Sequence, residues 1–393
     1  MYRKTYAKID HNKLTKNAKE IIKKYPDYQY YIGVVKNNAY HHGIKIVNAL
    51  KEGGINYFAV SSLEEAIELR KYNLDTPVLI LEPIDPEYIF DCINNNITIT
   101  IESLQYLKEI EKLDIKYDLK IHLKIDSGMN RLGYKNRKEL EESVERIQKN
   151  PKMILEGIYT HFATSGIIDP HWDEQLMHFK DLTQNIDLTK IPIVHLGRSQ
   201  TLVNHSKIDF CTGIRLGIIL YGFSQSRKKD MSLKGKLREW KNKRICKKYS
   251  ISKTTTENEL SLETAFSLHS TIISIRKVAA NEAIGYGAKF KMKADGYIAT
   301  IPIGYADGVN QRFSYVSINH KKYPIIADTM DMISVLVDNN IKEGMHVEIF
   351  GIDIPISEVT KELKINAYQL FNQIQNRVPR IHVSNKEEEE AKY

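Results

Sequence analysis

Short apolar runs alternate with amphipathic, charged stretches from residue 28 to about residue 220. The runs have the length and composition of buried strands, and the stretches between them repeat apolar residues at helical spacing. The expected strands are residues 28–35, 57–60, 77–81, 97–101, 119–125, 155–160, 193–195 and 214–221. The expected helices include residues 45–52, 62–72, 137–149 and 173–183. This alternation predicts parallel strands in an α/β fold, with enough units for a closed (β/α)8 barrel.

The pattern changes after Gly222. Residues 224 to about 260 are polar and basic, and we interpret them as a linker or an insertion. Beyond them, strands are expected at residues 266–275, 296–303, 323–327, 333–337, 346–349 and 379–383, with one helix at 356–364. We therefore expect a cofactor-binding barrel over 1–224, a basic linker over 225–260 and a β-rich domain over 261–393.

Composition excludes several classes of protein. With 42% hydrophobic and 27% charged residues among 393, the chain is globular rather than disordered. Its apolar runs are too short to span a bilayer, and residues 1–7 lack the apolar core of a signal peptide. Cys92, Cys211 and Cys246 match neither a metal spacing nor a disulfide framework. These features favour a cytoplasmic protein without a metal or a membrane partner.

The net charge of +8 comes from one segment. Residues 227–248 contain eleven Lys or Arg and two Asp or Glu, a net +9, so the remainder of the chain carries −1. We interpret this segment as a solvated loop and expect no nucleic-acid partner. The alternative is a surface for an anionic partner, which deletion of 227–248 and salt-sensitive binding would reveal.

Polar residues stand at the ends of several expected strands. Lys36 directly follows the apolar run that ends in Val34 and Val35. A desolvated lysine amine at the carboxyl end of a barrel strand is a nucleophile toward aldehydes, although such a lysine can also simply extend to water. Other strand ends carry the segments 122–133, 159–162, 195–199 and 215–218. Their joint occurrence predicts one site at the mouth of the barrel.

These segments resemble the motifs of the alanine racemases. Residues 34–40 resemble the pyridoxal-phosphate signature of that family. Further family motifs match, in order, residues 126–133, 159–163, 284–287, 303–308, 330–331 and 377–380. The resemblance covers nearly the whole chain and implies a barrel joined to a β domain. It also implies a head-to-tail homodimer that binds pyridoxal 5'-phosphate and interconverts L- and D-alanine, supplying D-alanine for cell-wall synthesis.

The resemblance implies a role for each site residue. Lys36 would hold the cofactor as an aldimine and act as the base on one face, with Tyr286 of the partner subunit on the other. Arg215 would face the pyridine nitrogen and keep it unprotonated, and His161 would link Arg215 to that tyrosine. The remaining residues implied are Arg131 for the cofactor and the substrate carboxylate, Tyr40, Ser199, Gly217, Ile218 and Tyr368 for the phosphate, and Tyr305 and Met330 for the substrate entrance.

Lys124 corresponds to a lysine that is often carbamylated in this family, where the carbamate would orient Arg131. The alternative is an unmodified amine paired with a carboxylate. Three features depart from the family: Gly197-Arg198-Ser199 replaces Ala-Asn-Ser, Thr329 replaces a cysteine that the family often has, and the basic stretch 227–248 has no counterpart in most members. Arg198 could add a phosphate contact or alter the pocket.

Three other functions are compatible with parts of this pattern. A racemase for serine or another small amino acid differs only in its pocket. A decarboxylase of related fold usually places a cysteine where this chain has Tyr286. A pyridoxal-phosphate carrier with a similar barrel lacks the β domain.

Overall fold

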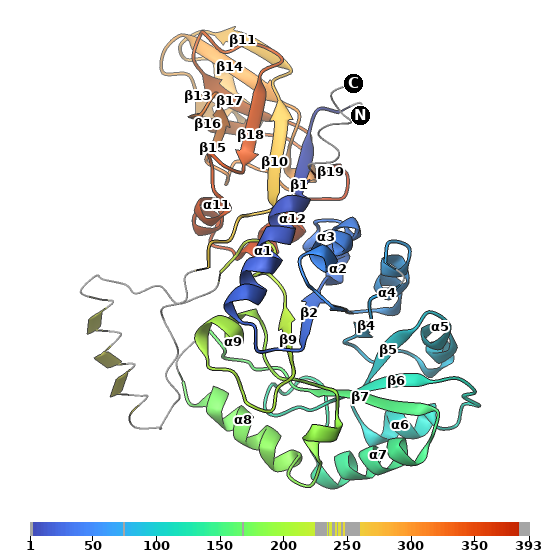
Figure 1. Ribbon diagram of the computed structural model, residues 1–393. Helices are drawn as coiled ribbons and strands as arrows, with labels where there is room; N and C mark the ends of the chain where they lie inside the picture. The colour runs from blue at the N-terminus through green and yellow to red at the C-terminus, as the bar shows by residue number, and fades with distance from the viewer. Residues whose placement is uncertain are drawn as a thin grey trace. The chain divides into compact units, whose positions relative to one another are not determined.

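The computed structural model describes residues 3–73, 75–166, 169–224, 234, 236–237, 240–241, 243–244, 247 and 260–384 (Figure 1). Most of the expected linker, and most of its basic segment 227–248, lies outside the described residues. The chain divides into two compact units. The barrel unit comprises Leu14–Ala39 and Ile44–Glu263, and the β unit comprises Met1–Lys13, Tyr40–Gly43 and Thr264–Tyr393.

The barrel unit is built on one parallel sheet of eight strands in the order β8-β7-β6-β5-β4-β3-β2-β9. The strands are β2 (Tyr30–Val34), β3 (Tyr57–Val60), β4 (Val78–Ile80), β5 (Ile97–Ile101), β6 (Leu119–Lys124), β7 (Met153–Tyr159), β8 (Ile193–His195) and β9 (Gly213–Leu216). An isolated bridge between Arg198 and Arg215 joins the chain after β8 to β9, so the barrel is nearly closed. The predicted (β/α)8 fold class is confirmed.

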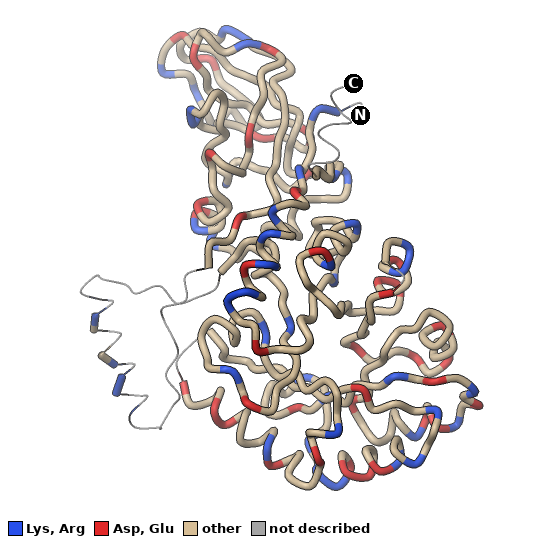
Figure 2. The backbone as a smooth tube through the Cα atoms, viewed as in Figure 1, with Lys and Arg blue, Asp and Glu red and all other residues tan. Residues whose placement is uncertain are grey.

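The helices of this part of the chain are α1 (His11–Lys24), α2 (Lys36–Tyr40), α3 (Val47–Glu52), α4 (Leu63–Arg70), α5 (Ile89–Asn94), α6 (Leu104–Ile110), α7 (Arg137–Lys149), α8 (His171–Leu182) and α9 (Ser199–Asn204). Helices such as α7 and α8 lie on the outer side of the strands (Figure 1), whereas α2 is the short turn after β2. Ser62, Ser103 and Asn136 each start a helix with a side-chain oxygen that accepts a backbone N–H of the first turn. Figure 2 shows acidic and basic residues mixed along α7 and α8.

One expected barrel strand is shorter than predicted. The apolar run 214–221 forms β9 only as far as Leu216. The chain then turns: the N–H of Leu220 donates to Gly217 O (2.9 Å) and the N–H of Tyr221 to Ile218 O (3.2 Å). Ile218 and Tyr221 are nonetheless fully buried, so an apolar run reports burial without specifying extended backbone.

The β unit contains a nine-stranded sheet in the order β11-β14-β17-β16-β15-β18-β10-β1-β19 and a small sheet of β12 and β13. The strands are β1 (Tyr6–Asp10), β10 (Phe266–Thr271), β11 (Ser274–Val278), β12 (Ala283–Ile284), β13 (Phe290–Lys291), β14 (Gly296–Ile301), β15 (Tyr315–Ile318), β16 (Lys321–Asp328), β17 (Ile333–Val337), β18 (His346–Phe350) and β19 (Arg380–Val383). The helices are α11 (Ile356–Leu363) and α12 (Ala367–Gln373). The expected strand 266–275 is thus two strands.

The first residues of the chain belong to the β unit. Strand β1 pairs antiparallel with β10 and parallel with β19. We expected all of residues 1–224 to belong to the barrel. The expected domain limits, 1–224 and 261–393, stay a prediction. Among the described residues, no helix is both long enough and apolar enough to cross a bilayer.

Candidate active site

Lys36 follows β2 at the carboxyl end of the barrel strands and opens an unusual turn. Residues 37–41 all have positive φ, between 49° and 63°, so this one-turn helix is left-handed. The left-handed conformation costs about 1–2 kcal/mol per L-residue, so neighbouring groups must hold it. Glu65 accepts the N–H of Asn37 (2.5 Å), and Asn38 Oδ1 accepts the N–H of Ile44 (2.9 Å). A strained turn held in this way is typical of a functional site.

Arg215 lies in β9 and is buried. Its guanidinium donates hydrogen bonds to Nδ1 of His195 (2.7 Å) and to the carbonyl oxygens of Thr160 (2.6 Å), Leu196 (3.1 Å) and His195. These acceptors stand at the carboxyl ends of β7 and β8. Burial lowers the pKa of Arg215 to about 10, so the side chain keeps its positive charge at neutral pH. The barrel mouth therefore contains a fixed cation.

His161 lies two residues beyond the end of β7 and close to several cations. Burial and the charges of Arg215 and Arg198 hold its pKa well below the usual value, so the imidazole is neutral near pH 7. Arg131 and Lys124 act on it in the same direction. Four cationic side chains around one neutral histidine make the mouth electropositive, which suits an anionic ligand.

Ser199 and Gly217 meet at the same mouth. Ser199 is the first residue of α9, and its Oγ accepts the N–H of Gly217 (2.9 Å). Ile218 follows Gly217 directly and is buried. The structure thus brings together the three residues of the barrel unit that the sequence assigned to the phosphate. Arg198, which departs from the family motif, immediately precedes Ser199.

Lys124 ends β6 in a desolvated position. Its Nζ lies 5.4 Å from the centre of the Tyr159 ring. Burial, together with the nearby charges of Arg131 and Arg215, lowers its pKa to about 8. Roughly a tenth of the amine is therefore neutral at pH 7, far more than for a surface lysine.

Arg131 stands on a turn that Asp126 organises. The Asp126 carboxylate accepts the backbone N–H groups of Gly128 (3.1 Å), Asn130 (2.9 Å) and Arg131 (3.0 Å). Asn130 has φ +55°, which a short polar side chain tolerates. Arg131 is exposed, and its charge acts on both His161 and Lys124 at the barrel mouth.

Two predicted phosphate residues meet in the β unit. The rings of Tyr40 and Tyr368 lie 5.2 Å apart, edge to face, with an interplanar angle of 68°. Tyr40 is buried, whereas Tyr368 is at the start of α12 and partly exposed. The predicted phosphate residues thus form one group in each unit.

Three residues predicted to act on a partner's site are exposed on the β unit. The exposed fractions are 80% for Tyr286, 51% for Tyr305 and 53% for Met330. The backbones of the last two are linked, because the N–H of Ala306 donates to Met330 O (2.9 Å). Single exposed apolar side chains are common on protein surfaces, whereas neighbouring ones mark a surface that another protein can cover, and the linked turns of Tyr305 and Met330 bring two of these residues together.

Glycines allow the backbone to reach these positions. A Cβ at Gly304 would lie 2.5 Å from Met330 O, so only glycine fits beside the turn that carries Met330. Gly285, which precedes Tyr286, has φ +72°, and a Cβ there would lie 2.7 Å from Ala327 Cβ. Both residues belong to motifs that the sequence singled out.

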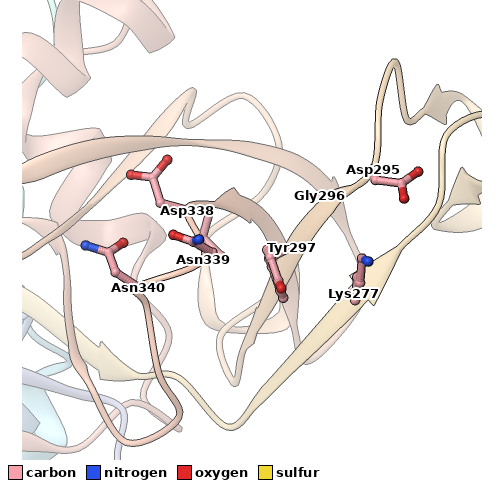
Figure 3. Close-up of a pocket in the computed structure, with 8 residues that line it drawn as sticks. Lys277, Asp295, Gly296, Tyr297, Asp338, Asn339 and Asn340 are labelled. Carbon is pink, nitrogen blue, oxygen red and sulfur yellow. The ribbon is translucent and has the colours of Figure 1, made fainter.

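A surface pocket of the β unit contains none of the predicted site residues (Figure 3). It is lined by Lys277, Asp295, Gly296, Tyr297, Val337, Asp338, Asn339 and Asn340. Sequence reasoning also assigned no role to Glu65, Asp126 or His195. His195 had a visible signal, since it ends an apolar strand; Glu65 had none, since its partner Asn37 is distant in the sequence.

Comparisons with known proteins agree over both units. The family models "Alanine racemase, N-terminal domain" and "Alanine racemase, C-terminal domain" match residues 9–225 and 265–382. Alanine racemase 1 of Bacillus subtilis (strain 168) is 30% identical over 393 residues, which cover 98% of this chain and 94% of that protein. The crystal structure of alanine racemase from E. faecalis matches with a TM-score of 0.84 at 28% identity, covering 97% of this chain and 99% of that one.

A histidine racemase from Leuconostoc mesenteroides subsp. sake also matches, with a TM-score of 0.83 at 24% identity, covering 98% of this chain and 99% of that one. A likeness at this identity shows the shared fold alone.

Proposed function

Because this chain belongs to the alanine racemase family, we propose that it interconverts L- and D-alanine with pyridoxal 5'-phosphate as its cofactor. The observation that carries the proposal is the position of Lys36. This amine lies two residues beyond the end of a buried barrel strand and stands at the start of a left-handed turn. The D-alanine produced would serve cell-wall synthesis.

The residues of the barrel mouth fit this cofactor. Bound pyridoxal phosphate supplies an aldehyde carbon for a primary amine and a ring that withdraws electrons from the substrate's α-carbon. Lys36 offers the amine. Ser199 and the backbone of Gly217 and Ile218 offer neutral donors for a phosphate, and the family resemblance adds the phenols of Tyr40 and Tyr368 of the β unit. The positive charges near His161 match the anionic groups of such a ligand.

Arg215 would contact the ring nitrogen as a permanent donor. A guanidinium has only N–H groups to offer and keeps its proton, so the ring nitrogen beside it stays unprotonated. Its hydrogen bonds to three carbonyl oxygens prevent the side chain from turning away. Arg131 would contact the phenolic oxygen of the cofactor and hold the substrate carboxylate.

Racemisation requires proton transfer at the α-carbon on two opposite faces. Lys36 would serve one face and Tyr286 of the partner subunit the other, with His161 as the orienting link. The high exposure of Tyr286, Tyr305 and Met330 supports a head-to-tail homodimer in which these side chains enter the other subunit's site. Carbamylated Lys124 would orient Arg131 by its negative charge.

The cofactor site is tested by chemical labelling. Borohydride reduction of the purified protein should fix the cofactor onto the peptide that contains Lys36. Labelling of a different lysine would overturn the assignment of Lys36. A coupled assay with L-alanine, L-serine, L-lysine and L-histidine side by side then tests the substrate, and preference for any of the last three would replace alanine.

The shared site is tested by mixing inactive variants. Lys36→Ala and Tyr286→Phe each damage one half of every site in a homodimer. In a mixed dimer of the two, one site carries both changes and the other carries none. Refolding an equal mixture should therefore restore about a quarter of wild-type activity. No recovery, despite mixed dimers detected by mass spectrometry, would contradict the shared site.

A further inference from the structure

The buried Arg215 has neutral groups as its direct partners. The described residues contain no ion pair to Arg215, and its hydrogen-bond acceptors are three carbonyl oxygens and Nδ1 of His195. Charged groups are rarely buried without compensation, because removing a cation from water is costly. The compensating charge should therefore be sought further along the hydrogen bonds.

A chain of buried hydrogen bonds leads from Arg215 to a carboxylate. His195 Nε2 lies 2.9 Å from His122 Nδ1, and His122 Nε2 lies 3.2 Å from Glu156 Oε2. Both histidines are fully buried. This relay, defined as His195, His122 and Glu156, crosses the interior of the barrel from β9 through β8 and β6 to β7.

Every hydrogen bond along this relay is donated in the same direction, from Arg215 toward Glu156. Arg215 can only donate, so His195 Nδ1 accepts and His195 Nε2 carries the proton. His195 Nε2–H then donates to His122 Nδ1, and His122 Nε2–H donates to the carboxylate of Glu156. Burial lowers the pKa of both histidines, so both rings are neutral in this arrangement. The relay therefore has one positive end and one negative end.

Glu156 is held as an anion. Burial by itself raises its pKa, but the hydrogen bond and the charge interaction with His122, together with the hydrogen bonds from Tyr57 and Thr98, outweigh burial and lower the pKa to about 2. The Tyr57 hydroxyl donates to Oε2 at 2.6 Å and the Thr98 hydroxyl at 2.9 Å. Three donors on one oxygen mark a site built for a negative charge.

The backbone of β7 is adapted to place this carboxylate. Ile121 pairs with Leu155 and His122 with Gly157, so Glu156 is the extra residue of a β-bulge. A bulge redirects a side chain, and here it brings Glu156 to groups on β3, β5 and β6. Gly157 makes room for the imidazole, since a Cβ there would lie 2.5 Å from His122 Nδ1.

We propose that Glu156 is the counter-charge of the buried Arg215, acting through the neutral rings of His195 and His122, and that this relay orients the guanidinium at the barrel mouth. Glu156, His122 and His195 are then positioning residues. Their effect on the cofactor rests on the proposed function, whereas the charge balance within the barrel does not.

Other titratable groups around Arg215 do not replace this charge. Tyr159 and Cys211 keep their protons, because burial raises their pKa values to about 12 and about 11. Arg198 and Arg131 are cations and His161 is neutral. Among the unmodified side chains that perturb Arg215 or contact it, none supplies an anion at neutral pH. A carbamate on Lys124, whose charge interaction with Arg215 is direct, would add a negative charge at the barrel mouth but would lie outside this line of hydrogen bonds.

The relay is tested first in the unaltered full-length protein. Nitrogen-15 spectra of histidine-labelled protein should show His122 and His195 with the proton on Nε2 and with no titration between about pH 5 and about pH 9. A proton on Nδ1 of either ring, or an imidazolium signal at neutral pH, would overturn the proposal. This readout is independent of racemase activity, so it separates failure of the relay from failure of the proposed function.

Two matched variants then separate charge from packing. Glu156→Gln keeps an oxygen that can accept from His122 but removes the negative charge. Tyr57→Phe removes a donor to the same oxygen and leaves the charge in place. With the charge lost, hydrogen exchange at the Arg215 guanidinium should rise about tenfold or more in Glu156→Gln and about twofold or less in Tyr57→Phe.

Cofactor affinity, measured by absorbance titration, should fall more in Glu156→Gln than in Tyr57→Phe. Equal effects of the two variants on exchange and on affinity would show that Glu156 only packs the barrel, and would overturn the counter-charge. Loss of cofactor affinity in Glu156→Gln without faster exchange at Arg215 would also overturn the counter-charge, because the relay is proposed to act on the cofactor only through Arg215.

Discussion

Replacing Asp307 by asparagine should loosen the turn that carries Tyr305. Asp307 is fully buried, and its carboxylate accepts hydrogen bonds from both terminal nitrogens of Arg3 and from the N–H of Gly304 (2.9 Å). It also pairs with Nε of Arg377 at 3.1 Å. One carboxylate thus ties the start of the chain and Arg377 to the turn of Tyr305. Asparagine offers a single oxygen and turns its NH2 group toward these donors.

The size of the effect follows from exposure. The side chains of Arg3 and Arg377 are 26% and 44% exposed, so both regain water when the anion is lost, and their two contacts are worth roughly 2 kcal/mol together. The Gly304 N–H is buried, and an unsatisfied buried donor costs about 1–3 kcal/mol. The expected loss is about 3 kcal/mol, at the low end for a broken buried ion pair.

Urea unfolding of the full-length protein, with the protein concentration held the same for all variants, measures this loss. With a denaturant slope near 3 kcal/mol per molar, typical of a larger domain, Asp307→Asn should lower the midpoint by about 1 M. Asp331→Asn is the control, since Asp331 pairs with the same Arg377 (2.8 Å) but is 50% exposed. Its cost should stay below about 1 kcal/mol. Equal midpoints for the two variants would refute the reasoning that burial decides the strength of these contacts.

Three further outcomes are expected. Tyr286→Phe should leave the free energy of unfolding within about 0.5 kcal/mol of wild type, because the side chain is 80% exposed. The same variant should abolish deuterium uptake from solvent on one face of the substrate, and equal uptake from both enantiomers would contradict the two-base scheme. Lys124, with its pKa lowered to about 8, should gain the mass of a carboxyl group in bicarbonate above about pH 8 and lose it in acid, and an unmodified amine throughout would exclude the carbamate. Glu156 has its pKa lowered from 4.5 to about 2, so its stabilisation is complete above pH 4.5 and is lost as the pH falls toward 2; the difference in unfolding free energy between wild type and Glu156→Gln should shrink by roughly 3 kcal/mol over that range, and a constant difference would argue against an ionised Glu156.

Local pattern determined much of this protein. Alternating apolar runs and amphipathic stretches predicted the barrel, because a strand buried on both faces and the helix that covers it each leave a distinct period in the sequence. The motif residues were also visible, since Lys36, Lys124, His195 and Arg215 interrupt apolar strands or stand at their ends. Burying a polar group costs free energy, so a polar residue inside or at the end of an apolar strand indicates a specific role.

Contacts between distant residues decided the rest. Strand β1 joins the sheet of the β unit because its partners, β10 and β19, come more than two hundred residues later, and no local signal reports such pairing. The left-handed turn after Lys36 depends on Glu65, and the direction of Glu156 depends on a bulge defined only against β6. The sequence by itself determined which side chains carry charge and chemistry. Only the folded chain decided that a carboxylate, two neutral histidines and an arginine form one line, because hydrogen-bond direction exists only between groups that the fold has brought into contact.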